Sequence, residues 1–171
     1  DNTENKQKLR DALHVLAFSS MVIKDYDAGY NYGLKYYKLC FQIAKLLPND
    51  QNAHIECVDA VSFLSHYFAT KKEMDKSLQY AKSACEMADS IFKYFNNAKT
   101  LLCLAKINTE YASLLLSDKK YKEALDSCKR AVSASFKLVD MAKQKGAGFS
   151  VDFELEIFDA LYDGIKLMGD I

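Results

Sequence analysis

Residues that break helices are scarce in this sequence. Its 171 residues include one proline, Pro48, six glycines and no tryptophan. So few breakers favour long helices over many short strands. No apolar run approaches the roughly 20 residues that a membrane-spanning helix needs, and the polar segment 1–8 predicts no signal peptide. We expect no membrane span, and the missing initiator methionine indicates either an excised fragment or a processed chain.

The cysteines follow no disulfide or metal-binding pattern. Their number is odd, their spacing is irregular, and the sequence has neither a Cys-x-x-Cys pair nor an Asn-x-Ser/Thr sequon. All lie in apolar helical contexts, where a reduced cysteine packs as a small hydrophobic residue. This usage predicts a reducing compartment and a cytoplasmic location. The five are Cys40, Cys57, Cys85, Cys103 and Cys128.

A formal net charge of zero conceals an uneven distribution. The segment 71–145 holds 15 basic and 9 acidic residues, whereas 146–171 holds one lysine and six acidic residues. The two segments either neutralise each other within the fold, which we favour, or form two separate faces.

Helical spacing of apolar residues predicts seven helices. In 8–26, for example, Leu9, Leu13 and Leu16 fall on one stripe. Three antiparallel pairs and one final helix account for the chain. We expect the pairs at about 8–47, 50–95 and 98–143, and the last helix at 150–169.

Local signals place the expected helix ends. Residues 27–29 are expected to form the first turn, Thr70 and Glu73 match a capping box, and Ser150 is a helix-capping residue. The clearest break is 144–148. The amphipathic pattern of the last helix comprises Phe153, Ile157, Phe158, Leu161, Ile165 and Met168.

A repeated local pattern organises the three pairs. A large residue is followed three positions later by a small one, then by leucine, and a second small residue falls seven after the first. The first small residues, Gly33, Ser77 and Ala124, are 44 and 47 positions apart. Such a period is typical of stacked units. The small residues fit helix crossings, where axes approach to about 8–10 Å. The second small residues are Cys40, Ala84 and Ala131, and the large ones expected between successive pairs are Tyr30, Met74 and Tyr121.

These features resemble the tetratricopeptide repeat family. The third unit matches best, through Ala112, Tyr121, Ala124, Leu125 and Ala131. The period exceeds the family's usual length, as in its long-repeat variants, and the family's tryptophan and most of its repeat-ending prolines are absent. The resemblance implies an all-α, right-handed superhelix of three antiparallel helix pairs with a C-terminal capping helix. It further implies a single domain over 1–171.

In this family the first helix of each pair lines a concave groove. The groove in this chain would be apolar at one end and small and polar at the other, which suits an amphipathic helix or an extended peptide. The alternative is that these positions pack against the chain's own last helix. Of the positions that clamp a terminal carboxylate in some members only Lys106 survives, and Glu110 would repel that ligand. The expected groove residues are Phe18, Val22, Tyr26, Ser62, His66, Lys106, Thr109 and Ser113.

No constellation in the sequence predicts chemistry. His54 and Cys57 share a helical face, but two ligands do not make a zinc site. The Gly146–Gly148 stretch does not follow a strand, so it is no phosphate loop. We expect no enzyme activity, no cofactor and no metal.

The sequence therefore predicts a protein–protein interaction scaffold that binds a partner peptide or helix. One alternative is a structural subunit that self-associates in a larger assembly. A second, less favoured alternative is nucleic-acid binding by a basic stripe, because the chain has only two arginines, the residues best suited to phosphate and base contacts. The stripe comprises Lys119, Lys120, Lys122, Lys129, Arg130 and Lys137.

Overall fold

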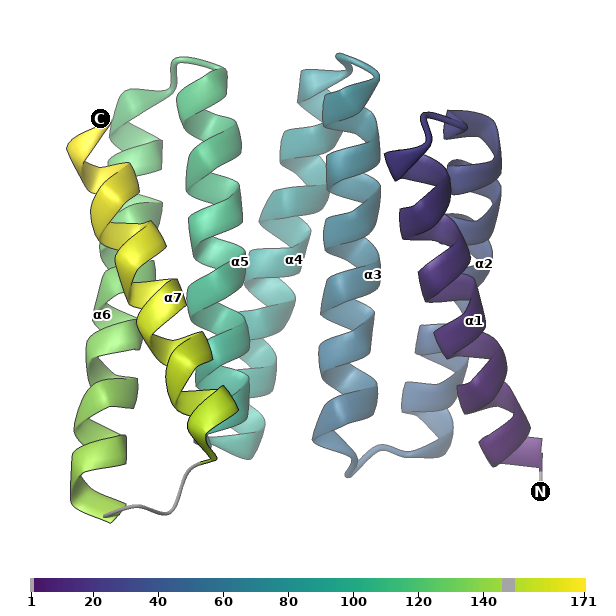
Figure 1. Cartoon of the computed structure of the whole chain (residues 1–171), viewed down its shortest axis with the longest axis horizontal. Helices are drawn as coiled ribbons and strands as arrows, with labels where there is room; N and C mark the ends of the chain where they lie inside the picture. The colour runs from purple at the N-terminus through teal and green to yellow at the C-terminus, as the bar shows by residue number, and fades with distance from the viewer. Residues whose placement is uncertain (1, 146–149) are drawn as a thin grey trace. The chain divides into compact units, whose positions relative to one another are not determined.

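The computed structural model describes residues 2–145 and 150–171, and within these ranges the chain forms seven α-helices and no strand (Figure 1). The predicted all-α class and helix number are confirmed. Of the expected 144–148 break, residues 144 and 145 belong to α6 instead, and 146–148 lie outside the described residues. The helices are α1 (Asn2–Val22), α2 (Tyr26–Leu46), α3 (Gln51–Thr70), α4 (Met74–Phe95), α5 (Ala98–Ser117), α6 (Tyr121–Lys145) and α7 (Val151–Gly169).

The chain divides into two compact units, Asp1–Ala84 and Cys85–Ile171. In the first unit α2 packs against both α1 and α3. In the second unit α5, α6 and α7 pack on one another. Helix α4 contributes its first half to one unit and its second half to the other. The single domain and the right-handed superhelix stay predictions. Among the described residues, no helix is both long enough and apolar enough to span a membrane.

The first turn lies earlier than the sequence predicts. Residues 27–29 belong to the first turn of α2, not to the connection. The Asp25 carboxylate caps this helix by accepting a hydrogen bond from the Ala28 backbone N–H at 3.1 Å. Gly29 is buried and serves packing, since a Cβ at this position would lie 3.1 Å from the Met21 sulfur in α1. The glycine was therefore wrongly interpreted as a turn residue.

The capping box expected at Thr70 and Glu73 is also wrong. Thr70 is the last residue of α3, and its hydroxyl donates to the His66 carbonyl at 2.9 Å. Lys72 has a φ of 60°, so the chain reverses before α4 can begin. A capping box occurs instead at α5, where the Asn97 side chain accepts from the Thr100 N–H. Ser150 caps α7 as expected, accepting from the Phe153 N–H at 3.2 Å.

Small residues do mark the helix crossings. Gly33 in α2 faces Phe63 in α3 so closely that a Cβ would lie 2.1 Å from a ring carbon. This contact joins one helix pair to the next instead of closing a pair. Ser77 in α4 is buried, and its carbonyl accepts from the Ser65 hydroxyl of α3 at 2.8 Å. Ala124 in α6 is fully buried.

Aromatic side chains fill the space beside these crossings in the first unit. Tyr30 stacks on Tyr67 with ring centroids 4.6 Å apart, and Phe68 stacks on Tyr80 at 5.4 Å. These contacts link α2, α3 and α4, so Tyr30 fills the wedge between successive pairs as expected. Tyr121 does not follow this pattern, because 53% of it is exposed.

Replacing Gly33 with alanine should destabilise the protein by about 1–3 kcal/mol, because the added methyl collides with the buried Phe63 ring. The loss should appear although alanine is the better helix former by about 1 kcal/mol. Urea unfolding followed by circular dichroism measures the difference. Gly169→Ala is the matched control, since a Cβ there meets nothing within 4 Å. Equal stability of Gly33→Ala and the parent protein would contradict the close approach.

The buried Cys57 thiol should make the protein less stable at alkaline pH. Burial, reinforced by the nearby Glu56 carboxylate, raises the pKa of Cys57 from 9.0 to about 12. Between these values the unfolded chain loses the thiol proton while the folded chain keeps it. Stability should therefore fall as pH rises from 9 to 12, by up to about 1.4 kcal/mol per pH unit for this one group. Urea unfolding across this range should show a shallower fall for Cys57→Ala, and identical slopes would refute the assignment.

Candidate functional site

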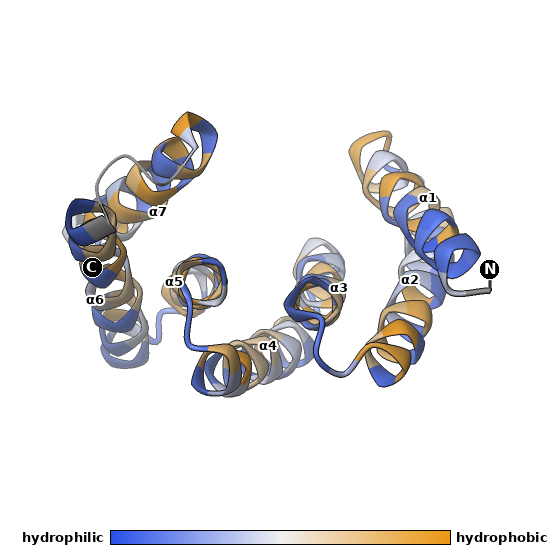
Figure 2. Cartoon of the chain, turned by 90° about the horizontal axis from the view of Figure 1, so that it is seen from below, coloured by the Kyte–Doolittle hydropathy of each residue, from blue (hydrophilic) through white to orange (hydrophobic). Residues whose placement is uncertain are grey.

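A stripe of exposed apolar side chains runs along α1. Val15, Phe18 and Val22 recur at helical spacing and are 61%, 42% and 80% exposed. We call these three residues the α1 stripe. The hydrophobic part of α1 is its C-terminal half, whereas its N-terminal half is hydrophilic (Figure 2). No Asp, Glu, Lys or Arg occurs from Ala12 to Ile23, so no charged side chain of this segment borders the stripe.

Aromatic contacts fix the central member of the stripe. The Phe18 ring meets Phe63 of α3 edge-on, with centroids 5.0 Å apart, and lies 4.6 Å from the His14 ring. Phe63 is itself held in place at the Gly33 crossing. The structure thus places Phe18 against α3, in contact with Phe63, the residue that follows Ser62 in the sequence.

The other expected groove residues of the first unit lie on α3 (Ser62 and His66) and at the start of α2 (Tyr26). His66 is exposed, and its Nδ1 lies 3.0 Å from the Ser62 carbonyl oxygen, one turn earlier. Ser62 is buried, so it can shape the surface but offers little area to a ligand. Tyr26 is half-buried, with the Lys71 ammonium 5.6 Å from its ring centroid.

In the second unit, two of the three expected groove residues, Lys106 and Thr109, lie beside α7. Lys106 of α5 forms an ion pair with Glu156 of α7 at 2.6 Å. Thr109 bonds back to the Ala105 carbonyl, and a Cβ on Gly164 of α7 would lie 3.9 Å from its hydroxyl oxygen. These two positions therefore face the chain's own last helix. Ser113, one turn further along α5, is exposed.

Apolar burial fixes α7 in this position. Ile157 and Ala160 enter a cluster with Leu101 and Leu138, and all four are at least 95% buried. Gly164 permits close contact, since a Cβ there would lie 3.0 Å from a Val132 methyl carbon of α6. The Lys106–Glu156 pair is exposed, so it adds little to this packing.

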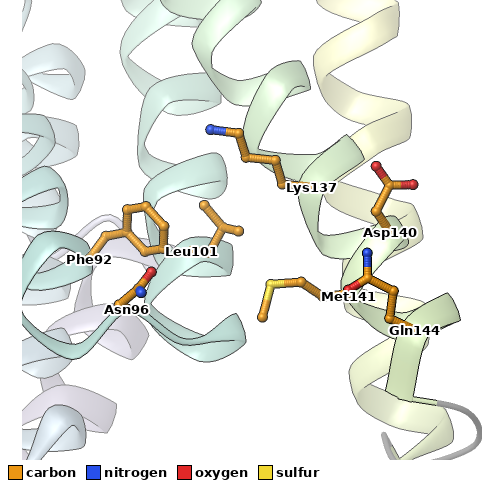
Figure 3. A pocket seen from close by; sticks show the side chains of 7 residues that line it. All are labelled: Phe92, Asn96, Leu101, Lys137, Asp140, Met141 and Gln144. Atoms are coloured by element: carbon orange, nitrogen blue, oxygen red, sulfur yellow. The ribbon is translucent and has the colours of Figure 1, made fainter.

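A pocket of about 310 Å³ lies between the end of α4, the start of α5 and α6 (Figure 3). Phe92, Leu101 and Met141 form its apolar wall, while polar side chains, among them Lys137 and Asp140, stand at its rim. None of the expected groove residues lines it. It offers room for a small apolar group but no constellation of catalytic groups.

A polar network inside the first unit joins residues that no local sequence pattern brings together. The Tyr36 hydroxyl donates to Glu56 at 2.8 Å, and the Arg10 guanidinium lies 3.8 Å from the same carboxylate oxygen. Burial raises the pKa of Tyr36 well above its ordinary value. The network ties α1, α2 and α3 together and keeps the phenol protonated. Within the described ranges, no three His, Cys, Asp or Glu side chains come together to hold a metal ion.

Comparison with family models and with curated proteins gives no match. Among solved structures the chain is similar to the DHF79 filament, with a TM-score of 0.57 and 12% identity over 98% of this chain and 87% of that one. It is also similar to the DHF58 filament, with a TM-score of 0.56 and 13% identity over 98% of this chain and 85% of that one. Similarity to DHR64, a de novo designed helical repeat protein, has a TM-score of 0.49 and 12% identity over 99% of this chain and 96% of that one. At these identities the two filaments inform on the fold alone. Together with the repeated helix pairs, they show an all-α helical repeat fold.

Enlarging Gly164 should detach α7 from α5 and α6. A Gly164→Val side chain would collide with Val132, so amide hydrogens of α7 should exchange roughly tenfold faster or more. Hydrogen exchange read by mass spectrometry measures this change. Gly169→Val, at the open end of the same helix, is the control and should leave the rest of α7 unchanged. Unchanged protection in Gly164→Val would show that α7 does not depend on this contact.

Proposed function

We propose that the first unit is a protein-interaction module whose α1 stripe and neighbouring α3 surface bind an apolar face of a partner helix or peptide. The exposure of Val15, Phe18 and Val22 along one helix carries this proposal. Apolar side chains at such spacing are the usual anchors of helix-in-groove recognition. The proposed site excludes Lys106 and Thr109, which face α7.

The chemistry of the partner follows from the surface. The stripe is uncharged, so the partner should present leucine, phenylalanine or methionine at i, i+3 or i+4, and i+7. His66 would meet a polar group at the border of this contact. We assign the module no catalysis, and we propose a tetratricopeptide-like adaptor of the cytoplasm on the resemblance described above.

Phe18→Ala should weaken binding of a selected amphipathic peptide about tenfold or more, because an aromatic anchor at an interface commonly contributes at least that factor. The peptide is selected against the whole protein from a library with apolar residues at the stated spacing, and fluorescence anisotropy gives its affinity. His66→Ala should weaken binding less.

Two matched variants control this experiment. Phe136→Ala removes a phenylalanine of α6 that is 53% exposed, against 42% for Phe18, and His54→Ala removes a histidine outside the site. Neither should change the affinity, and circular dichroism should show the helices of all variants intact. Equal loss in Phe18→Ala and Phe136→Ala, or no loss in either, would place binding elsewhere.

A second candidate function is self-association as a structural subunit. The specific observation is a second exposed apolar surface, on α7, where Phe158 is 58% and Tyr162 is 66% exposed. Two structures of similar fold are filaments, as their names state. Nucleic-acid binding by the basic stripe has less support, since Lys120 already pairs with Asp118 at 2.8 Å.

A further inference from the structure

Helix α7 has a regular apolar face on the side that does not enter the core. The residues of this face are alternately four and three positions apart, which is the spacing of a coiled-coil seam. We call them the α7 seam. They are Val151 (72% exposed), Leu155 (56%), Phe158 (58%), Tyr162 (66%) and Ile165 (49%).

The core-facing side of α7 is a separate row. Ile157, Ala160 and Gly164 are buried against α5 and α6. The expected amphipathic pattern mixed the two rows, because Phe158 and Ile165 are exposed and not part of the core. The α7 seam therefore remains available after the helix has packed, and its 4–3 spacing fits another helix better than a flat surface.

Charges beside the seam distinguish the directions in which a second α7 could lie. Asp152 and Asp159 occupy one flank and Lys166 follows them on the same flank, while Glu154 lies on the other. In a parallel pair, Glu154 would approach Asp159 of the second helix, which is repulsive, and Lys166 would face only Leu161. In an antiparallel pair, same-flank positions meet, so Asp152 approaches Lys166 of the second copy. This attraction occurs twice because a two-fold axis relates the helices.

We propose that the α7 seam is a homodimer interface in which two copies of the helix pack antiparallel about a two-fold axis that crosses the seam at the level of residue 160. In this register Leu155 meets Ile165 of the second copy, and Phe158 meets Tyr162. Antiparallel helices also align their dipoles favourably. Asp159 faces its own copy across the axis, so one repulsive contact weakens the dimer. The inference rests on the second proposed function, self-association, and names its surface and orientation.

The seam spans only two heptads, so the dimer should be weak, with a Kd on the order of 10–100 µM. Sedimentation equilibrium of the whole chain over a concentration range that brackets this Kd measures it. Phe158→Glu should lower the affinity at least about thirtyfold, because it places a charge in the centre of the seam. The substituted position is exposed, and circular dichroism should show an unchanged helix content.

Charge variants test the orientation. Asp152→Lys should weaken the dimer roughly three- to tenfold, since it turns two attractive pairs repulsive. Adding Lys166→Asp should restore the affinity in an antiparallel pair and should not in a parallel one. Asp159→Asn should tighten the dimer about twofold by removing like charges at the axis. Asp163→Asn, off the seam on the same helix, is the control and should change nothing.

The outcomes separate the inference from the function on which it rests. A chain that stays monomeric at every concentration overturns both. A dimer that Phe158→Glu leaves intact supports self-association but overturns the α7 seam as its surface. If Phe158→Glu abolishes the dimer but Lys166→Asp does not restore the affinity lost in Asp152→Lys, the surface stands and the antiparallel arrangement is overturned.

Discussion

The close approach of neighbouring helices at small residues is the constraint on which the rest of the structure depends. Gly33 lets the Phe63 ring lie directly against the α2 backbone, and Gly164 does the same for Val132 at α7. Where helix axes approach this closely, a side-chain hydroxyl can donate to a backbone carbonyl of the next helix, as Ser65 donates to Ser77. The tight crossings therefore fix both apolar packing and the few polar contacts inside it.

The positions of the candidate surfaces follow from these crossings. Phe63, held against Gly33, leaves an edge on which Phe18 rests, so the α1 stripe has a rigid base while much of Phe18 stays exposed. At the other crossing Gly164 draws α7 onto α6, and Glu156 reaches Lys106 of α5. Close helix crossings thus support an exposed apolar stripe in the first unit and place α7 beside Lys106 and Thr109 in the second.

Much of the fold could be predicted because its signals are local or periodic. The repeated small residues and the 3.6-residue spacing of apolar residues predict the number of helices correctly, and Ser150 is correctly predicted as the N-cap of α7. The prediction for Gly29 is wrong because a glycine that permits close packing cannot be told from a turn residue without its neighbour on the adjacent helix, here Met21. The contacts of α7 with the second-unit positions could not be predicted for a related reason. Periodicity shows that α7 is amphipathic but not which of its two apolar rows enters the core, so the ion pair between Lys106 and Glu156 could not be predicted.

The two exposed surfaces differ in a way that bears on what each can bind. The segment from Ala12 to Ile23 has no formally charged residue, so nothing on it discriminates the direction or identity of an apolar helix laid along the α1 stripe. Charges flank the α7 seam at fixed heptad positions, and they change sign along the helix between Asp159 and Lys166. Flanking charges determine partner and orientation in coiled coils at little gain in affinity. A surface without them suits varied partners. A surface whose flanking charge changes sign along its length is complementary to a second copy of itself in the reverse direction. We therefore assign binding of other proteins to α1 and self-association to α7.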